Sequence, residues 1–158
     1  MEGIEMCIET IYQKPETALA LKKTAISMDG ISETMKEGFT RLMDYLAEQG
    51  RQIAGAPYCA YTNVNEDFSQ FDVELGIPVT EPVPAQGDFH MSQTCEGKAV
   101  SIMHKGAYKD MEASYMALME YTTKNSLELT GVFYDFYLNN PADTPESELL
   151  TKIVYMVK

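Results

Sequence analysis

An acidic residue lies among aromatic residues in the segment Phe133-Tyr134-Asp135-Phe136-Tyr137. Side chains alternate along a strand, so Phe133, Asp135 and Tyr137 are predicted to share one face. If that face lines a cavity, a carboxylate among aromatic rings suits a lipophilic cation. If the face is solvated, Asp135 is an ordinary polar strand residue. The residues by themselves leave both interpretations open.

Glu74 is a second candidate acid, in a segment where apolar and polar residues alternate between 71 and 79. A solvent-facing position is the simpler explanation of Glu74. The neighbouring Gly76 nevertheless lacks a side chain, which can mark the close approach of a ligand or of backbone. Asp135 or Glu74 could also act as a general base, with a tyrosine such as Tyr137 as proton donor, which makes a hydrolase the alternative function.

Motifs for several other chemistries are missing from the sequence. It contains no phosphate-binding glycine loop, no zinc-protease motif and no nucleophile elbow. Only two histidines occur, His90 and His104, and the latter is expected at the surface. The three cysteines are widely spaced, which predicts reduced thiols in a cytoplasmic protein. We therefore expect no metal site, no disulfide scaffold and no cofactor.

The charge of the chain limits its partners. The 158 residues carry a formal net charge of −12, which argues against direct binding to nucleic acid or to anionic membranes. No apolar run reaches the length of about 18 residues that a transmembrane helix needs. A protein partner remains an alternative, because an acidic surface can mimic nucleic acid. The acidic residues are scattered rather than grouped, which favours a small-molecule partner over this alternative.

The chain contains an internal duplication. Residues 28–63 align without a gap with residues 104–139, and nine of the 36 pairs are identical. The tyrosines Tyr58 and Tyr134 are matched in this alignment, whereas Cys59 is matched with Asp135. The acid therefore belongs to one copy only, and any pocket built on it should be asymmetric.

The elements that must position these residues follow the same duplication. Each half is predicted to be β-β-α-β-β, with one helix that Ser32 caps and Gly50 ends, and a second from about 108 to 125. We expect an α+β fold with antiparallel sheets and one helix per half. The predicted single domain has a first half at about 1–79, a linker at about 80–88 and a second half at about 89–158. A cleft is expected at the seam between the halves.

The segment from Phe133 to Pro141 resembles the aromatic-Glu-x-Tyr-Leu-Asn-Asp-Pro segment of the GyrI-like small-molecule-binding superfamily. Four further segments agree with that superfamily in order, at 36–42, 71–79, 104–108 and 144–151. The superfamily includes effector-binding domains of AraC- and MerR-type regulators and stand-alone DNA gyrase inhibitory proteins. Because no helix-turn-helix precedes the first predicted strand, we expect a stand-alone domain, with either a separate DNA-binding protein or no link to DNA. The protein partner expected as the alternative is a regulator or a topoisomerase.

The resemblance implies a pseudo-two-fold fold whose central groove binds amphipathic, often cationic, small molecules. The family glutamate that faces such ligands is matched here by Asp135, which is one methylene shorter. Tyr108 and Tyr137 match family tyrosines. Some relatives hydrolyse cyclopropane-bearing toxins, which would assign a catalytic role to a carboxylate and a tyrosine. The residues predicted to contact a ligand are Asp135, Tyr137, Phe133, Tyr58, Tyr108 and Glu74.

Overall fold

The computed structural model describes residues 8–158, which form two compact units. Unit 1 contains the described residues up to Lys14 together with Glu96–Lys158, and unit 2 contains Pro15–Cys95. Within the described chain, each unit has one long helix and an antiparallel set of four strands. The predicted α+β class with one helix per half is confirmed.

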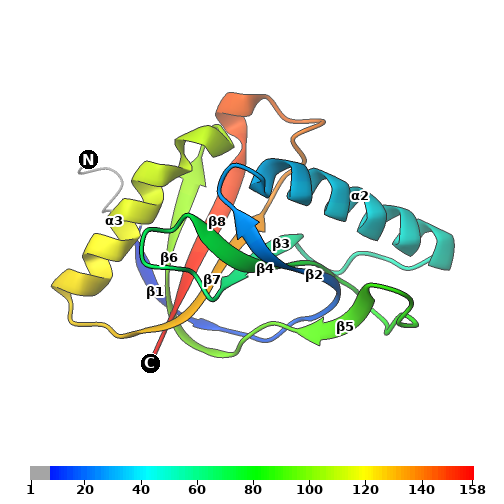
Figure 1. Cartoon of the computed structure of the whole chain (residues 1–158), viewed down its shortest axis with the longest axis horizontal. Coiled ribbons are helices and arrows are strands. Elements are labelled where there is room, and N and C mark those ends of the chain that lie inside the picture. Colours follow the sequence, from blue (N-terminus) through cyan, green and yellow to red (C-terminus); the bar gives the residue numbers. More distant parts are fainter. Residues whose placement is uncertain (1–7) are drawn as a thin grey trace. The chain divides into compact units, whose positions relative to one another are not determined.

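In unit 2, a single helix covers one face of the strands. The strand order is β3-β4-β2-β5, with bounds β3 (Tyr58–Thr62), β4 (Gln70–Pro78), β2 (Thr17–Ser27) and β5 (Phe89–Gln93). Helix α2 (Ile31–Gln49) lies along β2 and β4 (Figure 1). Leu42 of the helix and Leu21 and Leu75 of the strands are fully buried. The apolar alternation of β2 and β4 thus supplies the core beneath α2.

The ends of α2 confirm one prediction and correct another. Gly50 ends the helix in the left-handed conformation, with φ of 64°, as predicted. The helix begins at Ile31 after Gly30, so the prediction that Ser32 caps it is wrong. Gly38 faces the sheet, and a Cβ added there would overlap Leu75 Cδ1. A glycine at this point lets the helix approach the strands closely.

Unit 1 repeats this arrangement with different residues. Its strand order is β1-β6-β8-β7, with bounds β1 (Glu9–Gln13), β6 (Gly97–Lys105), β8 (Leu150–Val157) and β7 (Leu129–Tyr137). The 3₁₀ turn η1 (Tyr108–Asp110) leads into helix α3 (Met111–Lys124), which packs on β6 and β8 (Figure 1). A second 3₁₀ turn, η2 (Glu146–Glu148), precedes β8. The core under α3 includes Val100, Ile102, Leu118 and Ile153.

The compact units differ from the expected halves by an exchange of two strands. The runs β2-α2-β3-β4 and β6-α3-β7-β8 follow the same order, as the duplication predicts. Strand β1, however, pairs with β6, and β5 pairs with β2. Residues 8–14 consequently belong with 96–158, and residues 80–95 belong to unit 2. Alternation predicts that a segment is a strand, but it carries no information on which strand will pair with it. Cys7 and the start of the first predicted strand lie outside the described residues.

Replacing Gly38 with alanine tests the close helix–sheet contact. Overpacking a core costs about 1–3 kcal/mol, while alanine gains about 1 kcal/mol of helix propensity over glycine. We therefore expect Gly38→Ala to lower the free energy of unfolding by about 1 kcal/mol in urea denaturation. In a Leu75→Val background, which lacks the overlapping Cδ1, the same change should be neutral or stabilising. Equal destabilisation in both backgrounds would contradict the contact.

Candidate functional site

Asp135 lies in the core of unit 1, on the strand face that α3 covers. Asp135 is 2% exposed, and the hydroxyl of Tyr115 on α3 donates a hydrogen bond of 2.6 Å to Asp135 Oδ2. Phe133 shares this face and packs edge-on against Tyr155, with ring centroids 4.8 Å apart. The carboxylate is therefore buried beneath a helix and does not lie on a solvated strand face.

Tyr155 extends this buried polar network. Its hydroxyl donates to the backbone oxygen of Tyr115 at 3.2 Å. Burial, and then the charge of Asp135, raise the pKa of Tyr155 far above its usual value. A phenolate next to a carboxylate in this core would be strongly unfavourable, so the network requires a neutral Tyr155.

Tyr108 and Tyr137 form a second aromatic contact in unit 1. Their rings pack edge to face, with centroids 5.6 Å apart and an interplanar angle of 66°. Tyr108, in η1, is 37% exposed, and partial burial raises the pKa of its hydroxyl. The two predicted ligand residues are thus brought together, with Tyr108 on the solvent side.

The prediction that His104 is a surface residue is wrong. His104 is 7% exposed, and its two ring nitrogens contact Ser114 Oγ at 3.0 Å and the backbone oxygen of Ala107 at 2.9 Å. The imidazole thereby ties the end of β6 to the start of α3. Both nitrogens are occupied by structural hydrogen bonds, which explains the residue without a functional role.

Glu74 of unit 2 is surrounded by hydrogen-bond donors on the strand face opposite α2. Its Oε2 accepts from the Tyr58 hydroxyl at 3.3 Å and from Ser92 Oγ at 3.0 Å. Its Oε1 contacts His90 Nε2 at 3.0 Å. We call these four residues the Glu74 cluster. The structure therefore brings together two predicted site residues, Glu74 and Tyr58, and adds His90 and Ser92.

Small residues allow the side chains of the Glu74 cluster to meet. On β2, Ala20 pairs with Gly76 of β4 on one side and with His90 of β5 on the other. Tyr58 is opposite Gly76, and its ring fills the space that a Cβ at Gly76 would occupy. Because Ala20 separates β4 from β5 with only a methyl group, His90 reaches across β2 to Glu74.

The Glu74 cluster is partly open to solvent. The side chains of Glu74 and His90 are 24% and 41% exposed, whereas Tyr58 is fully buried. The buried phenol and Ser92 orient one carboxylate oxygen, and the exposed imidazole contacts the other. Such a carboxylate can exchange one donor for another without exposing the core.

Unit 1 carries the opposite charge at the position that corresponds to Glu74 of unit 2. Tyr134 pairs with Val154 in unit 1 as Tyr58 pairs with Gly76 in unit 2. Lys152 lies two residues before Val154 on β8, just as Glu74 lies two residues before Gly76 on β4. The Glu74 cluster is therefore specific to one unit.

His90 and Ser92 were missed in the sequence because only the pairing of β5 reveals their target. The alternation of His90 and Ser92 with Phe89 and Met91 does indicate a strand with one polar face. The predicted second half, at about 89–158, groups this strand with the strands that follow it. Pairing with β2 instead places both polar side chains beside Glu74.

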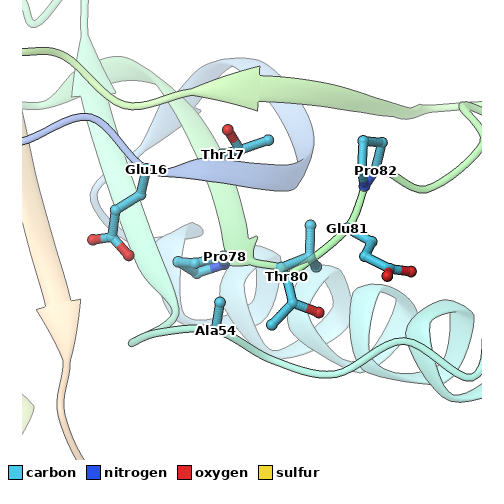
Figure 2. A pocket seen from close by; sticks show the side chains of 8 residues that line it. Glu16, Thr17, Ala54, Pro78, Thr80, Glu81 and Pro82 are labelled. Carbon is cyan, nitrogen blue, oxygen red and sulfur yellow. The ribbon is translucent and has the colours of Figure 1, made fainter.

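A pocket of about 320 Å³ lies elsewhere in unit 2, where β2 begins and β4 ends. Figure 2 shows Pro78 and Ala54 between Glu16 on one side and Thr80 and Glu81 on the other. None of the six predicted ligand residues lines it. This pocket and the Glu74 cluster are therefore at different places in unit 2.

Two further classes of site are not found in the described part of the chain. Between residues 8 and 158, no group of three histidine, cysteine, aspartate or glutamate side chains is arranged to hold a metal ion. None of the helices in that part is long and apolar enough to cross a lipid bilayer.

Comparison with known proteins gives one family and several similar folds. The family model described as "GyrI-like small molecule binding domain" matches residues 10–158. The crystal structure of the EcmrR C-terminal domain is similar with a TM-score of 0.82 at 17% identity, over 96% of each chain. The match to EcmrR in a DNA complex covers 97% of this chain and 58% of that one, with a TM-score of 0.80 at 17% identity.

Two other solved structures share the fold at lower similarity. SAV2435 bound to tetraphenylphosphonium has a TM-score of 0.67 at 12% identity, over 96% of this chain and 93% of that one. A hydrolase from Listeria innocua has a TM-score of 0.62 at 12% identity, over 96% and 91%. At these identities the similarity shows the fold alone. No curated protein sequence matches the chain.

The buried network of unit 1 predicts alkaline instability. A tyrosine whose pKa is raised by folding stabilises the protein fully below its unfolded pKa of about 10, and this stability is lost as the pH rises further. Tyr155→Phe should cost about 1 kcal/mol at pH 7 through the lost hydrogen bond. By pH 11 the wild type should lose about 1.4 kcal/mol that the variant keeps, since phenylalanine cannot ionise, so the variant should become as stable as the wild type or slightly more stable.

Urea denaturation from pH 7 to pH 11 measures this difference. Tyr121→Phe, on helix α3 of the same unit and half-buried, controls for the general effect of removing a phenol. A difference in the free energy of unfolding between the wild type and Tyr155→Phe that stays constant from pH 7 to pH 11 would refute the raised pKa of buried Tyr155 as the cause.

Proposed function

Because the chain belongs to the GyrI-like small-molecule-binding domain family, we propose that it binds amphipathic, cationic small molecules with Glu74 as the charged contact. The observation that carries this proposal is a partly exposed carboxylate held by three donors on the strand face opposite α2. Three hydrogen bonds fix the direction of the carboxylate before a ligand arrives, which lowers the cost of binding.

Burial distinguishes Glu74 from Asp135 as the ligand-binding acid. Asp135 lies beneath α3 and already accepts a short hydrogen bond from Tyr115. A ligand could reach it only if the helix moved away from the core of unit 1. Glu74 needs no such opening, because part of its side chain is in contact with solvent. We assign Asp135 and Phe133 to the core, and retain Tyr58 as the residue that orients Glu74.

Charge favours a cationic ligand over an anionic one. Among residues 8–158, the ion pair found for Glu74 is with His90, a residue that is charged only when protonated. The net charge of −12 also raises the local concentration of cations near the protein. SAV2435, which has a similar fold, is bound to tetraphenylphosphonium, a lipophilic cation. EcmrR, whose C-terminal domain has a similar fold, forms a complex with DNA, which is compatible with a role for the bound molecule as an effector.

A hydrolase is the second candidate function. The specific observation in its favour is the contact between a carboxylate and a phenol, Glu74 and Tyr58, which can serve as general base and proton donor. A hydrolase from Listeria innocua also shares the fold. The full burial of Tyr58 favours the binding function, because a proton donor must reach its substrate.

Matched charge-removing variants test the proposed binding function. At about 4 Å, a unit charge pair near a protein surface contributes roughly 1–4 kcal/mol. Glu74→Gln should therefore weaken tetraphenylphosphonium binding by at least about tenfold in isothermal titration calorimetry. Its affinity for neutral triphenylphosphine oxide should change little. Asp135→Asn, which can still accept from Tyr115, should bind both compounds like the wild type. A larger loss in Asp135→Asn than in Glu74→Gln would contradict the assignment.

Mass spectrometry of the protein with electrophilic, strained-ring compounds tests the hydrolase. Consumption of the compound by the wild type, abolished in both Glu74→Gln and Tyr58→Phe, would favour turnover. We expect the compounds to remain intact.

A further inference from the structure

The two oxygens of Glu74 are held by different kinds of donor. Tyr58 and Ser92, which are both neutral, donate to Oε2. His90, whose charge changes with pH, contacts Oε1 at 3.0 Å. Any ligand that uses Oε1 must therefore replace His90 or share the oxygen with it.

His90 is placed so that it can move. In unit 2, β5 is the last strand in the order and pairs only with β2. The side chain of His90 is 41% exposed, and its backbone pairs with Ala20 independently of the imidazole. Rotation of the ring toward solvent would release Oε1 without disturbing the strand.

The other charged groups of this face do not replace His90. Lys22 of β2 is paired with Glu74 in register, but no ion pair joins their side chains. Asp72 of β4 accepts hydrogen bonds from the side chain of Asn63 and the backbone of Ala25, and these hold its pKa low, with a further contribution from Lys22. Tyr58 contributes a neutral phenol from β3. Of the three groups that contact Glu74, the imidazole of His90 is therefore the one that becomes positively charged when it takes up a proton.

We propose that His90 is the residue that decides which ligands Glu74 accepts, by competing with them for Oε1. This inference rests on the proposed binding of cations at Glu74. Neutral His90 donates one hydrogen bond and is displaced by a cation at little electrostatic cost. Protonated His90 forms an ion pair with Glu74, and the negative charges of Glu74 and Asp72 are then balanced by the positive charges of His90 and Lys22. The site consequently binds permanent cations more tightly at neutral and alkaline pH than in acid.

The test measures tetraphenylphosphonium binding from pH 5.5 to pH 8 by isothermal titration calorimetry, because the charge of this probe does not depend on pH. The wild type should lose about tenfold in affinity between pH 8 and pH 5.5, in the range usual for coupling between two binding events. His90→Gln keeps an amide donor but cannot be protonated, so its affinity should change less than threefold. Circular dichroism at both pH values confirms that each variant remains folded.

Proton NMR provides a second readout, because the chain contains only two histidines. Reciprocity requires that the probe shift the titration of the His90 ring to lower pH. The buried His104 ring serves as the internal reference.

The outcomes separate the two proposals. Equal pH dependence in the wild type and in His90→Gln, or an unshifted His90 titration, would overturn the role of His90 while binding at Glu74 stands. No probe binding by the wild type at pH 8 would overturn the proposed function, and the role of His90 with it.

Discussion

The hydrogen bonds to Glu74 are the interaction on which the candidate site depends. A half-buried carboxylate is costly unless donors replace the water that it loses. Here the donors come from β3 and β5, which the strand order β3-β4-β2-β5 places on either side of the strand that carries Glu74 and of its neighbour β2. The order of the strands therefore matters more to the site than any single motif does.

The small residues of the same face are the second requirement. Ala20 and Gly76 occupy neighbouring positions on β2 and β4, and a larger side chain at either would meet Tyr58 or separate His90 from Glu74. The space left by the missing side chain of Gly76 is therefore filled by the ring of Tyr58, and not by a ligand. The close approach that a glycine permits in a strand is used here to bury the phenol that orients the carboxylate.

The two units show how a duplicated fold can diverge chemically. In unit 1 the acid lies under the helix, where Tyr115 and Tyr155 surround Asp135 and the polar groups satisfy one another. In unit 2 the residue aligned with Asp135 is the fully buried Cys59, and the acid is Glu74 on the opposite face. Lys152 takes the place of Glu74 in unit 1. Both acids are hydrogen-bonded, but Asp135 is buried beneath α3, whereas the side chain of Glu74 is partly exposed on the face opposite α2.

The sequence by itself determined the duplication, the α+β class, the end of α2 at Gly50 and the alternation that places Glu74 opposite Leu75. These properties are local or follow from similarity between two segments, so a single chain displays them directly. It did not reveal that β1 pairs with β6 and β5 with β2, nor that His104 is buried or that Asp135 lies beneath α3. Those features are set by contacts between residues on different elements of the chain, such as Glu74 and His90, which are 16 positions apart, or Tyr115 and Asp135, which are 20 positions apart. The alternation of apolar and polar residues indicates that a strand has two faces. Only tertiary packing decides which of these faces a helix covers and which remains exposed.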